Sequence, residues 1–298
     1  MKYISYIITL LFLLNTSCKN GEEKTSSPVI SVSILPQKYL VDKITSGKYK
    51  INVLIPSGAS PASYEPSPLQ ITQLNNSSLY LRIGEIVFEK TWIEKIGKQN
   101  PDLNIINISD NIDFIGAQNH RHSNDEEEQE ESHQHNIDHG KDPHIWMSAK
   151  NMKIISENVL TALTESFPSD SLMFVRNYKI LLDEINIIDS LFSSSTEILS
   201  GLNFLIYHPA LAYLARDYKM TQHVLEFEGK EPGPAHIASI IDMAQELNIK
   251  YIFVQRQFSI DNAKSLAKEI NAEIIVIDPL GEDWDEQLLN IHSILISK

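Results

Sequence analysis

The chain has 298 residues, of which 42% are hydrophobic and 21% are charged, and its formal net charge is −14 at pH 7. This composition excludes a wholly disordered protein and supplies enough apolar residues for one large or two medium hydrophobic cores. The acidic balance argues against a nucleic-acid-binding protein, because phosphate groups attract lysine and arginine.

The first element in chain order is a predicted export signal. A lysine at position 2 precedes an apolar run over residues 4–14, which is too short to span a membrane. Cys18 is the only cysteine and directly follows Asn-Thr-Ser, an arrangement that resembles a bacterial lipoprotein processing site, although asparagine stands where leucine is usual. A lone cysteine in an exported protein cannot form an internal disulfide, which favours lipidation over a buried thiol. We expect a signal peptide over 1–18 and a polar tether over 19–28.

From residue 29 onward, short β-branched runs alternate with amphipathic segments, a pattern typical of βα units and a parallel sheet. The expected strands of the first half lie in VISVSIL, INVLIP, SLYLRIG and LNIINIS. Those of the second half lie in NFLIYH, QHVLEFE, YIFVQ and EIIVID. Two sets of four units predict an α/β protein with two lobes, which we place over 29–166 and 201–298.

Within the first lobe, residues 117–141 are a predicted disordered insertion. They show no apolar periodicity and carry six acids within 125–131. Several imidazoles and carboxylates in one loop can bind metal ions weakly and raise their local concentration, whereas a purely solubilising insertion is the alternative. The histidines of the loop are His120, His122, His133, His135 and His139.

Between the two lobes, residues 167–200 are predicted to form a long connecting helix. Apolar residues recur there at helical spacing, namely Leu172, Val175, Tyr178, Leu182, Ile185, Ile188 and Phe192. A single helix of about 28 residues would be roughly 42 Å long. A helix of that length favours a rigid connection over a hinge.

Three residues at predicted strand ends or helix starts could converge in a cleft, because ligands of parallel α/β sheets bind there. His208 ends NFLIYH, Asp278 ends EIIVID, and His144 lies in DPHIWM just before a predicted helix. Imidazole suits zinc, and a carboxylate extends the range toward manganese or iron. Each residue also has a structural interpretation, as a hydrogen-bonded histidine or as an aspartate that caps a turn.

Six further elements occur in a characteristic order: VSILPQKYLVDKI, PSGASPASYEPSPLQITQL, DPHIWMSAKNM, IYHPALAYLARDY, EFEGKEPGPAHIASII and VIDPLG. With these elements the chain resembles the substrate-binding lipoproteins of zinc and manganese ABC importers, the ZnuA/TroA-like family. The resemblance implies two (β/α)4 lobes with parallel sheets, a long rigid linker helix and a metal site in the interlobe cleft. It also implies a periplasmic, membrane-anchored lipoprotein that acts as a monomer with an ABC-transporter permease and is not an enzyme.

Carried over by position, the family's metal ligands correspond to His144, His208 and Asp278. An acidic, His-rich insertion is typical of zinc members, so the resemblance favours Zn²⁺ over Mn²⁺ or Fe²⁺. One ligand position departs from the family, because its first histidine is replaced by Ala62, which cannot coordinate. Glu65 or water is the expected substitute, and a histidine of the insertion is a further alternative.

Two other functions stay open at this stage. A zinc hydrolase would hold the metal with two histidines and an acid and keep a position for water, with Glu65 as the general base. An adhesin or extracellular metal buffer would bind metal without a permease. The remaining histidines, His223, His236 and His292, are expected to be structural.

Overall fold

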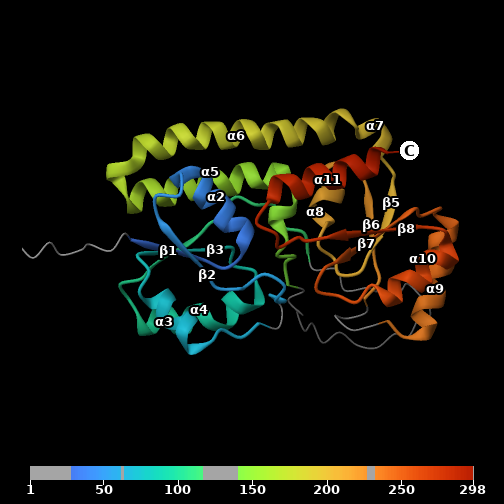
Figure 1. The fold of residues 1–298 in the computed structure, drawn as a ribbon, viewed down its shortest axis with the longest axis horizontal. Helices are drawn as coiled ribbons and strands as arrows, with labels where there is room; N and C mark the ends of the chain where they lie inside the picture. The colour runs from blue at the N-terminus through green and yellow to red at the C-terminus, as the bar shows by residue number, and fades with distance from the viewer. Residues whose placement is uncertain (1–27, 62–63, 117–139, 227–231, 298) are drawn as a thin grey trace, which may run out of the picture.

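The computed structural model describes residues 28–61, 64–116, 140–226 and 232–297. These residues form two four-stranded parallel sheets with helices packed around them (Figure 1). The strand orders are β2-β1-β3-β4 and β6-β5-β7-β8, so the two sheets have the same topology. The predicted α/β fold with two lobes is confirmed. Cys18, Ala62 and the five loop histidines lie outside the described residues.

The first sheet consists of four short strands: β1 (Val29–Val32), β2 (Lys50–Val53), β3 (Leu79–Arg82) and β4 (Asn104–Asn107). Helices α2 (Leu35–Thr45), α3 (Pro68–Asn75) and α4 (Val87–Gln99) connect them. Strand β1 ends before the predicted run VISVSIL does, because Pro36 in the first turn of α2 favours a helix start there. Ile30 and Val32 are fully buried, as expected for a parallel strand with covered faces.

The second sheet consists of β5 (Asn203–Ile206), β6 (Thr221–Val224), β7 (Tyr251–Gln255) and β8 (Glu273–Ile277). Its helices are α8 (Ala212–Asp217), α9 (Pro234–Glu246), α10 (Asp261–Ile270) and α11 (Trp284–Ile296). Along the chain, three helices come between the last strand of the first sheet and the first strand of the second. They are the short helix η1 (Ile145–Met147), α5 (Ala149–Ser166) and the short helix η2 (Pro168–Asp170). No helix in the described ranges is both long and apolar enough to cross a membrane.

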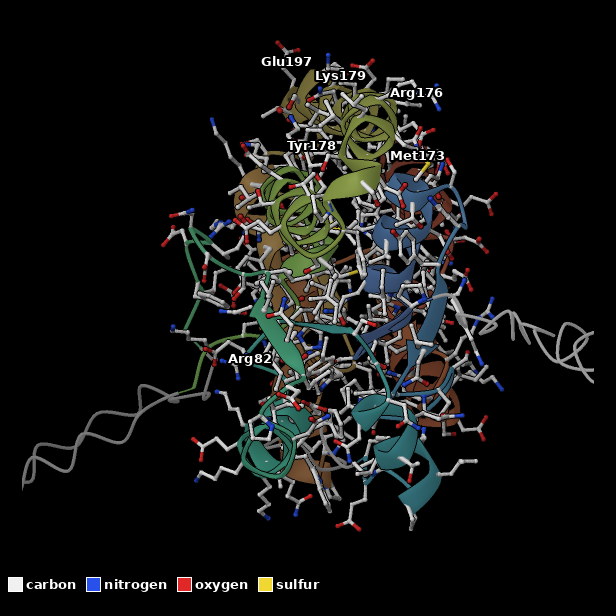
Figure 2. The ribbon with its side chains drawn as sticks, turned by 90° about the vertical axis from the view of Figure 1, so that its left-hand side faces the viewer. Arg82, Met173, Arg176, Tyr178, Lys179 and Glu197 are labelled. Atoms are coloured by element: carbon white, nitrogen blue, oxygen red, sulfur yellow. The ribbon has the colours of Figure 1, made fainter. Side chains whose placement is uncertain are left out.

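The connecting helix α6 (Ser171–Ser194) has 24 residues and is followed by the separate short helix α7 (Thr196–Leu199). The predicted length of about 28 residues is therefore wrong, because Ser195 interrupts the helix. In the first half of α6 the buried face also differs from the predicted one. Phe174 and Leu181 are buried, whereas Leu172, which was expected on the buried face, is 90% exposed. On the outer side, Arg176 and Lys179 point into solvent (Figure 2).

Helix α6 packs along both lobes and runs beside α5 and α11 (Figure 1). Near its start, Asn177 donates a hydrogen bond of 2.9 Å to the carbonyl oxygen of Ile44 in α2. Near its end, Phe192 stacks on Tyr218, with ring centroids 4.7 Å apart. One buried apolar cluster includes residues of both sheets and of α6. The two lobes therefore share a core to which α6 contributes, and the rigidity of the connection stays a prediction.

Candidate metal centre

His144 lies at the start of η1 in the DPHIW segment, where its ring is fixed by Asp142. The Oδ1 atom of Asp142 lies 2.8 Å from both the backbone nitrogen and the Nδ1 atom of His144. Asp142 is only 7% exposed, and its carbonyl oxygen accepts a 2.7 Å hydrogen bond from the hydroxyl of Tyr213. A carboxylate acceptor places the proton of the neutral imidazole on Nδ1. Nε2 is then the nitrogen available to a metal ion.

His208 follows strand β5 and is fixed in the same way by Glu226, which follows strand β6. Its Nδ1 atom lies 2.8 Å from Oε1 of Glu226. The fully buried Gln255, the last residue of β7, forms hydrogen bonds to both the backbone nitrogen and the backbone oxygen of His208. Its Oε1 accepts from the His208 nitrogen at 3.3 Å, and its Nε2 donates to the His208 oxygen at 2.5 Å. Nε2 of His208 is therefore also the nitrogen available for coordination.

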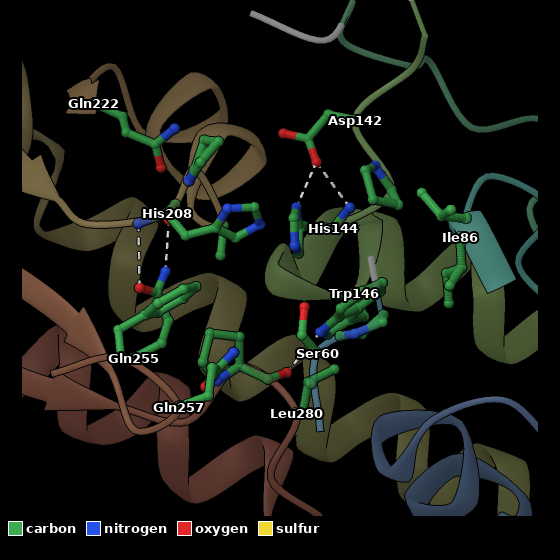
Figure 3. Close-up of a pocket in the computed structure, with 17 residues that line it drawn as sticks. Ser60, Ile86, Asp142, His144, Trp146, His208, Gln222, Gln255, Gln257 and Leu280 are labelled. Carbon is green, nitrogen blue, oxygen red and sulfur yellow. Dashed lines mark hydrogen bonds and ion pairs between the residues drawn. The ribbon is translucent and has the colours of Figure 1, made fainter. Parts of the chain in front are cut away.

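The two imidazoles lie side by side, although they come from opposite sides of the interlobe cleft (Figure 3). Their ring centroids are 5.2 Å apart, and the ring planes meet at 75°. Two imidazoles around one tetrahedral zinc ion, with Zn–N bonds of about 2.0–2.1 Å, place their ring centres about 5 Å apart. The observed separation therefore fits shared coordination of one ion.

The pair borders a cavity of about 240 Å³ between the lobes. The first half of the chain lines it with Ser60, Pro61, Ile86, Val87, Asp142, Pro143, His144 and Trp146. The second half lines it with His208, Pro209, Ala210, Gln222, Gln255, Gln257, Phe258, Pro279 and Leu280. Most of these residues follow the carboxyl end of a strand, where ligands of parallel sheets bind.

The two predicted carboxylate ligands do not join the histidines in this structure. Asp278 follows β8, and its Oδ1 atom accepts a 3.2 Å hydrogen bond from the backbone nitrogen of Leu280. Asp278 is not among the residues that line the cavity, although its neighbours Pro279 and Leu280 are. Glu65 is exposed and lies outside the lining. Within the described ranges, no group of three or more His, Cys, Asp or Glu side chains is arranged to hold a metal ion.

Sequence reasoning missed Asp142 and Glu226 as partners of the two histidines. The rule that singled out His208 also singles out Glu226, because both follow the carboxyl ends of neighbouring strands. Asp142 could have been found because an aspartate two residues before a histidine can accept from that residue's backbone nitrogen. No pattern along the chain predicts which carboxylate pairs with which ring.

A third buried carboxylate, Glu89, shapes the first-lobe wall of the cavity. It accepts hydrogen bonds from the Ser33 hydroxyl at 2.5 Å and from the backbone nitrogens of Ile83, at 3.0 Å, and Gly84. Burial raises the pKa of this carboxyl group above its ordinary value. These bonds fix the turn between β3 and α4, which carries the lining residues Ile86 and Val87.

The remaining described histidines lie outside the cavity lining. Nε2 of His223 is 2.9 Å from Oδ1 of Asn203. Nε2 of His292 is 2.9 Å from the Ser195 hydroxyl and 3.1 Å from the carbonyl oxygen of Leu191. Burial lowers the pKa of His292. His236 belongs to α9 and is not a lining residue. None of the three therefore lines the cavity, and their structural role stays a prediction.

The model of the family described as zinc-uptake complex component A, periplasmic, matches residues 30–291. A protein of Chlamydia trachomatis whose name proposes metal binding is 29% identical over 288 residues, which cover 96% of each chain. The high-affinity zinc uptake system protein ZnuA of Bacillus subtilis is 25% identical, over 95% of this chain and 90% of that one. A crystal structure of a ZnuA deletion mutant with zinc bound is 29% identical, with a TM-score of 0.77 over 90% of this chain and 97% of the other.

Proposed function

The chain belongs to the periplasmic zinc-uptake component A (ZnuA) family, and we propose that it captures a divalent transition metal outside the inner membrane and delivers it to an ABC-type permease. The observation that carries the proposal is the imidazole pair of His144 and His208, with ring centroids 5.2 Å apart. Zinc is the proposed cargo because neutral imidazole suits it and because the similar ZnuA structure holds it. Manganese and iron are the less favoured cargoes.

We assign His144 and His208 as ligands through Nε2, and Asp278 as a third ligand after its carboxylate turns toward the cavity. This rotation of the Asp278 side chain breaks its hydrogen bond to the backbone nitrogen of Leu280. The loss costs about 0.5–1.5 kcal/mol. Zinc binding in small structural sites contributes about 10–16 kcal/mol, so this cost is minor. Glu65 is exposed and lies outside the cavity lining, so it is the less favoured ligand.

Lipidation at Cys18 would hold a monomer at the membrane surface, facing its permease. The ligands bind metal only when deprotonated, so affinity should fall at acid pH. The shared core of the two lobes supports small local movements rather than wide closure, which leaves metal release to the permease.

A hydrolytic enzyme is the weaker alternative. It would need a general base beside the metal, and the only candidate near the altered ligand position was Glu65. The exposed position of Glu65 outside the cavity lining gives no support to that role. We therefore propose a binding protein without catalytic activity.

Metal titration of the purified, chelator-treated protein tests the proposal. We expect one tight zinc site per chain, which His144→Ala and His208→Ala each weaken strongly and Asp278→Asn also weakens. His223→Ala is the matched control, because this histidine lies outside the cavity, and it should bind zinc as the wild type does. Tight one-to-one binding that survives both His144→Ala and His208→Ala would refute the ligand assignment.

A further inference from the structure

The turn that begins with Asp278 contacts the first lobe, although it follows strand β8 of the second sheet. The indole nitrogen of Trp146, in η1, donates a 2.7 Å hydrogen bond to the carbonyl oxygen of Pro279. At the far end of the turn, Lys38 of α2 forms an ion pair with Glu282. Two elements of the first half of the chain therefore hold a segment of the second half.

The backbone of the Asp278 turn is fixed at three successive polar groups. The backbone nitrogen of Asp278 donates a 3.2 Å hydrogen bond to Oε1 of Gln287 in α11. The carbonyl oxygen of Asp278 accepts a 2.8 Å hydrogen bond from the backbone nitrogen of Gly281. The next carbonyl oxygen, that of Pro279, accepts the hydrogen bond from Trp146. The position of the Asp278 backbone is therefore set without a metal ion.

The carboxylate of Asp278 can change its partner while this backbone stays in place. Asp278 is partly exposed, and among the described residues its carboxylate has one hydrogen-bond partner, the backbone nitrogen of Leu280 at 3.2 Å. Rotation about the side-chain bonds exchanges that partner for a metal ion. Whether the rotated carboxylate meets an ion held by His144 and His208 then depends on where the backbone lies, because a ligand must be placed accurately to coordinate.

Trp146 connects the Asp278 turn with the segment that carries His144. It lies two residues after His144 and lines the cavity together with Pro279 (Figure 3). Trp146 is buried, and its own carbonyl oxygen accepts a 2.6 Å hydrogen bond from the indole nitrogen of Trp284. Because the ring and the backbone of Trp146 are both fixed, the Asp278 turn keeps one position relative to His144.

We propose that Trp146 and Gln287 are positioning residues for metal binding, an inference that rests on the metal-binding function proposed above. Neither side chain touches the ion. Together they hold the backbone on both sides of Asp278, so that its rotated carboxylate meets the ion between the two imidazoles. Partners of this kind, which orient a ligand from outside the coordination sphere, change metal affinity about 10–100-fold. The second lobe thus supplies the third ligand, and a residue of the first half of the chain aligns it.

A double-mutant cycle tests whether Trp146 acts through Asp278. The four full-chain proteins are the wild type, Trp146→Phe, Asp278→Asn and the double variant, and zinc affinity is measured by competition with a chromophoric chelator. We expect Trp146→Phe to weaken zinc binding about 10–100-fold in the wild-type background and to have no further effect in the Asp278→Asn background. A role confined to general folding, or one that acts through His144, would lower the affinity by the same factor in both backgrounds. That result would overturn the proposal.

Two further variants complete the experiment. Trp92→Phe is the matched control, because it makes the same substitution outside the cavity lining, and it should bind zinc as the wild type does. Gln287→Leu removes the acceptor for the backbone nitrogen of Asp278 and should show the same dependence on Asp278 as Trp146→Phe. It therefore tests the positioning role even if Trp146→Phe does not fold. Unchanged zinc affinity in Gln287→Leu would contradict the role of that residue.

The outcome separates this inference from the function on which it rests. If Asp278→Asn binds zinc as tightly as the wild type, Asp278 is not a ligand and the positioning role falls, while the histidine pair still supports the proposed function. If the wild type itself does not retain zinc, the proposed function is wrong.

Discussion

The indole nitrogen of Trp146 donates a 2.7 Å hydrogen bond to the carbonyl oxygen of Pro279, a residue 133 positions further along the chain. The indole nitrogen of Trp284 in turn donates a 2.6 Å hydrogen bond to the carbonyl oxygen of Trp146. These two bonds connect the segment that carries His144 with the segment that carries Asp278. The cavity wall is thus held together by hydrogen bonds from tryptophan side chains to backbone carbonyl oxygens, and these bonds do not depend on a metal ion.

Removing the indole donor should weaken this connection. Trp146→Phe keeps an aromatic ring but leaves the carbonyl oxygen of Pro279 without its donor. We expect the free energy of unfolding to fall by about 1–3 kcal/mol, the cost of an unsatisfied buried polar group. Urea unfolding measures the change. Trp92→Phe, at a partly exposed position in α4, should change stability much less, and an equal loss in both variants would contradict the assigned role.

The carboxylate of Glu226 should matter for metal affinity although it does not touch the metal. Glu226→Ala removes the acceptor that orients His208, and loss of such a partner costs about 10–100-fold in affinity. Glu226→Gln keeps an oxygen acceptor and should bind zinc more tightly than Glu226→Ala. Competition titration with a chromophoric chelator measures both variants. Glu246→Ala, exposed on α9, serves as the control, and an affinity loss in Glu226→Ala no larger than in that control would exclude the role.

His292 should make stability depend on pH. Burial lowers its pKa in the folded state below the value of about 6.5 expected when the chain is unfolded. The unfolded state therefore binds more protons below about pH 6.5, so the contribution is complete above that pH and is lost as the pH falls. We expect His292→Gln to lose less unfolding free energy than the wild type between pH 7.5 and 5.5. Identical losses, measured by urea unfolding, would show that His292 does not cause the dependence.

Deleting residues 119–139 should spare the tight site. Gly116 and Lys141 pair in an antiparallel bridge, and the backbone nitrogen of Asp142 donates a 2.9 Å hydrogen bond to the carbonyl oxygen of Ile115. The two ends are therefore adjacent and can be rejoined by a short linker. Zinc titration should show the tight site unchanged and the weak additional sites lost. Loss of the tight site would instead place a ligand within the deleted segment.

The strands were predictable because their signal is local. Each of the eight strands lies mainly within a predicted run of β-branched or aromatic residues, and parallel strands covered on both faces need such runs. The sequence also predicts His144 and His208 as candidate ligands, because they lie at a helix start and a strand end. The sequence predicts helix α6 but not which of its faces is buried along the whole length, because its apolar residues are too numerous to identify one face. Packing against Tyr49 buries Phe174 and leaves Leu172 in solvent.

The amino-acid sequence by itself determined the two lobes, the candidate histidines and the family. Only the tertiary structure decided that the ring centroids of His144 and His208 lie 5.2 Å apart. It also decided that Asp142 and Glu226 orient these rings. Asp278 does not join the two histidines there, and its carboxylate accepts a hydrogen bond from the backbone nitrogen of Leu280. The reason is physical. Strand and helix formation follows from the spacing of neighbouring side chains, whereas the meeting of two imidazoles depends on how two sheets and a shared core pack together.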